Sequence, residues 1–158
     1  MKALIAYDSL SPAKCTEKTA QTIRDALASK GIEAVANNVK GVDIPNIGGY
    51  DCLVVGSPIN GWRVTPSMKE FLDRLPQALT GKSAAAFDTR VKSFFSGDAA
   101  GKMEKRLASL GYRIIAPALP IYVRVAGASV GGEKNYELVE GELDKARAWA
   151  DKLTDSLK

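Results

Sequence analysis

The sequence predicts an α/β fold in which a parallel sheet carries helices on both faces. Short apolar runs alternate with amphipathic helical patterns along the whole 158-residue chain, and this alternation is typical of parallel sheets with helical crossovers. The clearest example is residues 50–75, where the run Cys52–Val55, closed by Gly56, is followed by a loop and a helical stripe. An apolar, β-branched run of this kind favours a strand that is buried on both faces.

The helix of that segment has both a start signal and an apolar face. Thr65 is a suitable N-cap, and Pro66 suits the first helical position because its missing N–H has no intrahelical partner there. Apolar residues at the spacing i, i+3, i+4 and i+7 then form one stripe along the helix. The stripe consists of Met68, Phe71, Leu72 and Leu75.

The first half of the chain supplies two further strands and one further helix. Residues 2–7 and 32–36 are predicted strands, and a helix begins near Thr16 between them. Gly31 is placed to end that helix as the residue beyond its C-cap. The inner face of the helix is predicted to be Ala20, Ile23 and Leu27. Residues 37–49 are polar and rich in glycine, with room for no more than a turn of helix near 44–47.

The second half continues the same alternation. A strand is predicted at 83–87, and Asp98 then caps a helix whose inward residues are Ala100, Met103, Leu107 and Leu110. The next strand, 112–123, is interrupted by Pro117 and Pro120. Since proline cannot donate to a central ladder, this strand is predicted at an edge of the sheet. A last helix is predicted from about Glu142.

Composition argues against metal-dependent hydrolysis, against Ser–His or Cys–His nucleophilic catalysis, and against a nucleic-acid site. The chain contains no histidine, so the commonest general base and the commonest transition-metal ligand are both missing. The net charge of +4 is modest and mixed with acids, which favours a solvated surface over a nucleic-acid site. No signal peptide and no run long enough to span a membrane is seen. Two cysteines favour a reducing cytoplasm, and we expect one domain over residues 1–158.

Three loops are expected to meet at one edge of the sheet. They are residues 8–15, 57–64 and 88–97, and they follow the first, third and fourth predicted strands. Ligands on open parallel sheets bind beyond the carboxyl ends of the strands, where the winding of the chain reverses. The sequence therefore predicts a ligand site made from these loops.

Residues 50–71 carry a pattern that resembles the flavodoxin family. The pattern is Y-D-x-L-V-x-G-S-P-x-x-G-W followed by T-P-x-M-K-x-F. The pieces Tyr-Asp-Ser at 7–9 and Thr-Glu-Lys at 16–18 are similar to the flavodoxin domains of diiron flavoproteins. The resemblance covers essentially the whole chain. It implies a three-layer sandwich with a five-stranded sheet in the order 2-1-3-4-5, one bound FMN, and one-electron transfer.

The resemblance also implies which residues hold the cofactor. A phosphate group needs hydroxyls, backbone N–H groups and a helix N-terminus, and the first loop offers these although it contains no glycine, having Pro12 and Ala13 instead. Its predicted cofactor-binding residues are Ser9, Leu10, Ser11, Lys14, Cys15 and Thr16. Those of the second loop are Ser57, Pro58, Ile59, Asn60, Gly61 and Trp62. Those of the third loop are Asp88, Thr89, Arg90, Phe94 and Phe95.

Individual roles follow from the same resemblance. Trp62 and one of Phe94 or Phe95 are expected to stack on the flavin ring. The peptide between Asn60 and Gly61 is expected to flip when the flavin is reduced, because glycine enters positive φ without steric cost; an ordinary tight turn is the alternative. Asp88 and Thr89 meet the pyrimidine edge of the ring through backbone groups or serve as structural polar caps.

Three functions remain open from the sequence. The first is an FMN electron carrier between redox proteins. The second is an FMN-dependent reductase of quinones driven by NAD(P)H, for which no nucleotide motif is found. The third is a flavodoxin-fold binding module without flavin. Electron transfer is favoured over an enzyme with its own substrate. The basic pI near 9.1 means either that the partners are acidic, such as ferredoxin-like proteins or reductases, or that the role is different. Neither a nucleic acid nor a membrane is expected as a partner.

Overall fold

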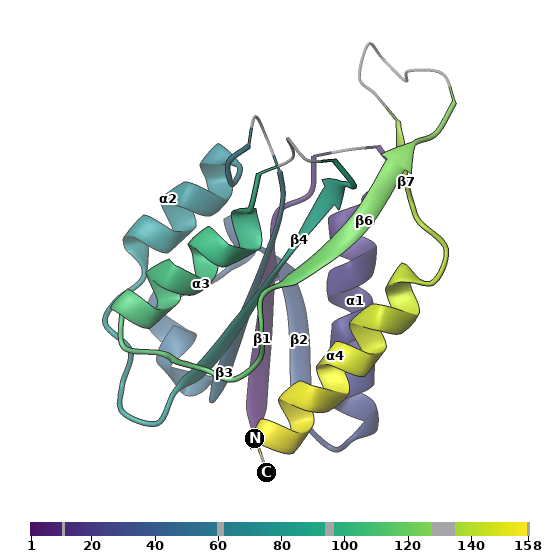
Figure 1. The fold of residues 1–158 in the computed structure, drawn as a ribbon. Coiled ribbons are helices and arrows are strands. Elements are labelled where there is room, and N and C mark those ends of the chain that lie inside the picture. The colour runs from purple at the N-terminus through teal and green to yellow at the C-terminus, as the bar shows by residue number, and fades with distance from the viewer. Residues whose placement is uncertain (11, 60–61, 94–96, 128–134, 158) are drawn as a thin grey trace.

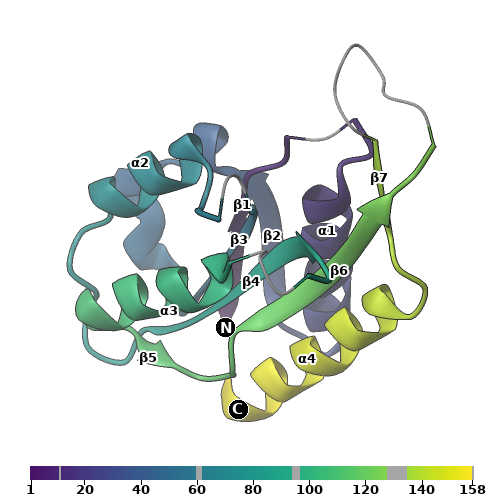
Figure 2. The same ribbon diagram turned by 45° about the horizontal axis from the view of Figure 1, so that its top comes forward.

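A twisted central sheet separates two pairs of helices in the computed structural model, which describes residues 1–10, 12–59, 62–93, 97–127 and 135–157 (Figure 1). One face is covered by α1 (Cys15–Ser29) and α4 (Glu142–Leu157). The other face is covered by α2 (Pro66–Arg74) and α3 (Ala99–Ser109), as the turned view of Figure 2 also shows. The predicted α/β class with helices on both faces is confirmed.

The sheet contains seven strands in the described part of the chain. Along the main path the order is β2-β1-β3-β4-β6-β7, and β5 also pairs with β4. All pairs are parallel except β6 with β7. The bounds are β1 Lys2–Tyr7, β2 Glu33–Asn38, β3 Cys52–Pro58, β4 Ser83–Val91, β5 Arg113–Ile114, β6 Leu119–Val125 and β7 Tyr136–Leu138.

The predicted order 2-1-3-4-5 is confirmed for the parallel part of the sheet, whereas the predicted count of five strands is wrong. The fifth position is shared by β5 and β6, which both pair with β4 on either side of the predicted interruption. The antiparallel β7 was not predicted. It pairs only with Val123–Val125, so the stretch of β6 that contains Pro120 has β4 as its one partner in the described residues. The edge position that was predicted from the prolines is therefore correct for that stretch of β6.

The core has two halves because successive residues of a buried strand point to opposite faces. In β1, Ala3 and Ile5 belong to the cluster under α1 and α4, whereas Leu4 and Ala6 belong to the cluster under α2 and α3. Every predicted inward residue of α1, α2 and α3 is buried. Among the described helices, none has both the length and the apolar character needed to cross a membrane.

Two strands are longer than predicted. The ends expected at Gly56 in β3 and at Phe87 in β4 are wrong, since the ladder between them continues through Ser57 with Asp88 and Pro58 with Thr89. These polar residues resemble loop residues in the sequence, but they are buried in or next to the ladder. The polar segment before β3 forms two short 3₁₀ helices, Val39–Gly41 and Ile44–Gly49, of which the second matches the predicted turn.

Candidate functional site

Buried polar side chains gather where β1, β3 and β4 end. Asp8 follows β1, whereas Ser57 and Asp88 lie in the last residues of β3 and β4; the three are 2%, 0% and 0% exposed. Backbone bonds tie the segments together: the N–H of Asp8 donates to Gly56 O over 3.0 Å, and the N–H of Ile59 donates to Thr89 O over 3.1 Å. The three predicted loops therefore start from one edge of the sheet.

The first loop ends in an uncapped helix. Lys14 precedes α1 in a left-handed conformation with φ 53°, and its side chain makes no cap hydrogen bond. The hydroxyl Oγ of Ser9 is buried and has no hydrogen-bond partner among the described residues. Leu10, in contrast, is half exposed. A buried hydroxyl and the first N–H groups of a helix whose N-cap side chain makes no cap bond form a donor set that suits an anion.

Cys15 is the first residue of α1 and packs inward. Its thiol Sγ lies 3.7 Å from the carbonyl O of Tyr136, so α1 contacts the β7 edge here. Burial raises the pKa of the Cys15 thiol despite the nearby Lys18. A thiol that resists ionisation is a weak nucleophile, and Cys15 therefore serves packing in this structure.

Thr16 contributes to the site through a buried pair of hydroxyls. Its Oγ1 lies 2.8 Å from Oγ1 of Thr89, and both residues are nearly inaccessible. Since Thr16 is in the first turn of α1 and Thr89 in β4, the pair joins the first loop to the third.

A second buried contact joins the first loop to α2. The hydroxyl of Thr65 donates to Asp8 Oδ2 over 2.6 Å. The Thr65 Oγ1 atom also caps α2, because it accepts from the N–H of Met68. The other carboxylate oxygen of Asp8 accepts from the N–H of Ser9 over 2.9 Å. The N–H of Thr65 in turn donates to Ser57 Oγ over 3.2 Å. These bonds fix where the second loop ends.

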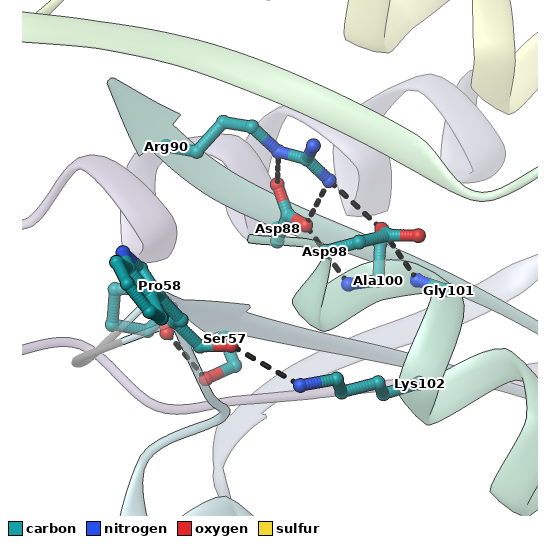
Figure 3. A network of polar contacts seen from close by, with 9 residues as sticks. Ser57, Pro58, Asp88, Arg90, Asp98, Ala100, Gly101 and Lys102 are labelled. Atoms are coloured by element: carbon teal, nitrogen blue, oxygen red, sulfur yellow. Dashed lines mark hydrogen bonds and ion pairs between the residues drawn. The ribbon is translucent and has the colours of Figure 1, made fainter. Parts of the chain in front are cut away.

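The third loop is held by an ion cluster at the start of α3 (Figure 3). Arg90 donates from Nε and Nη2 to the carboxylate of Asp88 over 2.8 and 2.5 Å, and from Nη2 to Asp98 over 3.0 Å. Asp88 also accepts from the N–H of Ala100, and Asp98 caps α3 by accepting from the N–H of Gly101. Arg90 thus connects the end of β4 with the first turn of α3.

Electrostatics in this cluster follow from burial. Loss of hydration raises the pKa of Asp88, and the hydrogen bonds from Arg90 and Ala100 restrain that rise. Burial also opposes ionisation of Asp98, but bonds from Gly101 and Arg90 together lower its pKa. With both carboxylates paired, Arg90 has its charge directed into the cluster and not toward a ligand.

Trp62 lies at the outer edge of the site with 61% of its surface exposed. Its φ of 69° is in the left-handed region, which is uncommon for a residue with a side chain. Its carbonyl O accepts from Lys102 Nζ over 3.3 Å. An exposed indole beside a ligand site is available to cover a planar ring.

Tyr7, the last residue of β1, connects the two elements on either side of the first loop. Its hydroxyl donates to Glu17 Oε1 over 2.7 Å. Burial, followed by this bond to a carboxylate, raises the pKa of Tyr7 to about 12. The pair ties the end of β1 to the first turn of α1.

The sequence-predicted site residues therefore fall into three groups. Thr89 contacts both Thr16, through the two hydroxyls, and Ile59, through the backbone. Pro58 and Asp88 are placed in strands, and Arg90 is engaged by carboxylates. Ser11, Asn60, Gly61, Phe94 and Phe95 lie outside the described residues, so the flipping peptide and the phenylalanine stack stay predictions.

Four further contributors were not among the predicted site residues. They are Asp8, Thr65, Asp98 and Lys102. Thr65 and Asp98 had been identified only as helix caps. A usable signal was present for Asp8, because an aspartate directly after a buried strand occupies the same position as Asp88 after the apolar part of β4.

Comparison with known proteins agrees with this geometry. The family described as "Flavodoxin domain" matches residues 5–113. An archaeal flavodoxin has 20% identity and a TM-score of 0.79, with 99% of each chain covered. Flavodoxin 2 from Bacillus cereus has 24% identity and a TM-score of 0.78, covering 98% of this chain and 99% of that one.

A longer protein also contains this fold. Rubredoxin:oxygen oxidoreductase from Desulfovibrio gigas has 18% identity and a TM-score of 0.76, with 99% of this chain and 36% of that chain covered. A comparison with curated protein sequences found no match.

Proposed function

Because the chain belongs to the flavodoxin family, whose cofactor is FMN, we propose that it carries single electrons between redox proteins. The bound flavin supplies a ring that accepts and releases electrons. The chain supplies a phosphate site, a cover for the ring and a surface for partners. The observation that carries the proposal is the start of α1, which has no side-chain cap, together with the buried Ser9 hydroxyl, which has no hydrogen-bond partner among the described residues.

The first loop fits the phosphate group. Phosphate oxygens are strong acceptors, and the start of α1, where the N-cap Lys14 makes no side-chain cap bond, lies in the same loop as the buried Ser9 Oγ. The positive end of a helix dipole favours a dianion there. Lys14 is available to add its charge, because its side chain is 65% exposed and its Nζ forms a loose pair with Glu17 Oε2 at 4.0 Å. The glycine-free loop therefore has the donor set that FMN requires.

The ring is assigned to the outer part of the site. Trp62 is exposed beside the strand ends, and the hydroxyl pair of Thr16 and Thr89 bounds the site from the inside. The polar groups of Asp8, Ser57 and Asp88 already accept hydrogen bonds within the protein. Thr65 donates to Asp8 and Ser57, and Ala100 donates to Asp88. Orientation of the ring then depends on backbone groups of the second and third loops, and on the indole.

For the partner, we propose an acidic redox protein such as a ferredoxin-like protein or a reductase. Arg63 is exposed next to Trp62, and α3 carries Lys102, Lys105 and Arg106 on its exposed side. We call these four residues the α3 basic surface. Glu104, the one acid within α3, is half buried. A basic surface beside the cofactor would steer a negatively charged partner to the place where electrons leave.

We also assign the carrier to a reducing compartment, the cytoplasm. Both cysteines are free and buried, which suits an environment where thiols stay reduced.

A reductive titration tests the carrier role. FMN-loaded protein is reduced stepwise under anaerobic conditions, and the absorption spectrum is followed against potential. Two separate one-electron midpoint potentials support the carrier. Steady oxidation of NADH or NADPH by the purified protein would instead identify the quinone-reductase alternative, and failure to retain FMN would identify a module without flavin.

A further inference from the structure

We propose that Gly97 and Lys102 are positioning residues which hold Trp62 in its left-handed conformation at the outer edge of the cofactor site. Neither was among the named site residues, although Gly97 is the last residue of the third predicted loop. Both belong to the start of α3, Gly97 directly before the cap residue Asp98 and Lys102 in the second turn. The inference rests on the proposed function, since the indole is taken to cover the flavin ring.

Trp62 needs a restraint from outside its own segment. A left-handed residue with a side chain is strained relative to the ordinary helical or extended regions, and Trp62 has φ 69°. Burial of the indole does not supply the restraint, because 61% of the residue is exposed. Within the part of the chain that the structure describes, the contacts that can hold this conformation reach the Trp62 backbone from Gly97 and Lys102.

Gly97 supplies a backbone contact that no other residue could make. A Cβ at this position would lie 2.9 Å from both Cα and carbonyl O of Trp62. Gly97 itself has φ +82°, which also favours glycine. The backbones of the second and third loops thus lie against each other because one of them has no side chain.

Lys102 supplies a polar contact to the same peptide. Its Nζ donates to the carbonyl O of Trp62 over 3.3 Å. A bond from a flexible, exposed lysine fixes a loop only if the lysine's own helix is fixed. Here the first turn of α3 is anchored, because the N–H of Ala100 donates to the fully buried Asp88 over 2.8 Å.

The ion cluster completes this anchor. Asp98 caps α3 and receives Arg90, which also binds Asp88, as Figure 3 shows. The orientation of Trp62 is therefore set by a chain of contacts from β4 through the start of α3 to the second loop. Gly97 and Lys102 are its last members, and they act on the cofactor through the indole alone.

Binding of FMN and of riboflavin to the apoprotein tests the proposal. Lys102→Met keeps the side-chain length and removes the donor, and Gly97→Ala adds the Cβ. Each is expected to weaken both flavins by about 2- to 10-fold, the effect of one lost aromatic stack, and to raise the emission of the bound flavin. Lys102→Arg, which keeps a donor, should restore most of the affinity.

Two controls separate positioning from general effects. Gly81→Ala introduces the same type of backbone strain, since Gly81 has φ +88° but nothing within 4 Å of its Cβ position. Lys152→Met removes one exposed positive charge from α4. Neither control should change flavin binding. A loss confined to FMN in Lys102→Met would show that the lysine acts on the phosphate by charge, which overturns the proposal.

A double-mutant cycle gives the decisive result. In a Trp62→Ala background, Lys102→Met should have no further effect on either flavin, because the group it positions is gone. An undiminished effect in that background overturns the inference, as does wild-type affinity in Lys102→Met. If the wild-type apoprotein binds no flavin, the proposed function itself fails. The Lys102 variants keep the test valid even if Gly97→Ala does not fold.

Discussion

The hydroxyl groups of Thr16 and Thr89 lie 2.8 Å apart in the interior of the site. Thr16 is the second residue of α1, and Thr89 lies near the end of β4, 73 positions later in the chain. The contact brings the predicted phosphate loop and the predicted ring loop to one point. Among the described residues, each hydroxyl has the other as its hydrogen-bond partner.

Replacing one member of this pair should destabilise the protein. Thr16→Val leaves the hydroxyl of Thr89 buried without its partner, at a cost of about 1–3 kcal/mol in the free energy of unfolding. Thr16→Val with Thr89→Val should cost less than the two single changes added together. Urea unfolding of the four proteins measures this, and strictly additive losses would mean that the two hydroxyls do not depend on each other.

Gly56→Ala should be among the most damaging changes in the sheet. The ring of Phe87 on β4 covers Gly56 on β3 so closely that an added Cβ would lie 2.0 Å from Cζ. Overpacking of a rigid core costs about 1–3 kcal/mol and sometimes more, so we expect the upper end of that range or failure to fold. Phe87→Leu in the same chain should recover part of the loss.

Gly41 offers the control for that substitution. It has open space around its Cβ position and no positive φ, so Gly41→Ala should leave stability nearly unchanged. Thermal unfolding of both variants compares them. A Gly56→Ala protein as stable as Gly41→Ala would show that the Phe87 ring moves freely.

Tyr7 gives the protein a specific sensitivity to alkali. Its pKa is raised from 10.0 to about 12 in the folded state, so the unfolded chain releases this proton first as the pH rises. The stability due to Tyr7 is therefore complete below the unfolded pKa and is lost as the pH rises through this window. Tyr7→Phe lacks that loss, and the stability difference between the two proteins should shrink across the window. A constant difference would contradict the assignment.

The α3 basic surface should control how fast acidic partners react. Lys105→Glu with Arg106→Glu reverses two charges there and should slow electron exchange with an acidic ferredoxin, measured by stopped-flow absorbance. Raising the salt concentration should slow the unmodified protein and narrow the gap between the two, since exposed charges are screened. Lys152→Glu on α4 is the control. A rate unaffected by salt or by charge reversal would place the docking surface elsewhere.

Elements that depend on local sequence patterns could be predicted from the sequence alone. The cap at Thr65, the stripe Met68 to Leu75 and the cap at Asp98 are all present as predicted. In each case a short pattern contains both the start signal and the buried face. Fold class follows from the alternation of such elements, which is why it could be predicted.

Features that depend on distant partners could not be predicted in the same way. Asp88 has the polarity of a loop residue, and it continues β4 only because Arg90 and Ala100 satisfy its carboxylate. Trp149 gave no separate signal, although its ring packs against Phe87 with centroids 6.5 Å apart and its N–H donates to Pro117 O. The contact of Lys102 with Trp62 spans 40 positions, and no local pattern encodes it.

Titration of the apoprotein with FMN and with riboflavin tests the central claim most directly. The two ligands share the ring and differ in the phosphate, so their comparison isolates the uncapped start of α1 and the buried Ser9 hydroxyl. We expect one FMN per chain, bound at least about 10-fold more tightly than riboflavin, since one charge-assisted hydrogen bond contributes about 1.5 kcal/mol or more. Equal affinities for the two flavins, or no binding of FMN, would contradict the account.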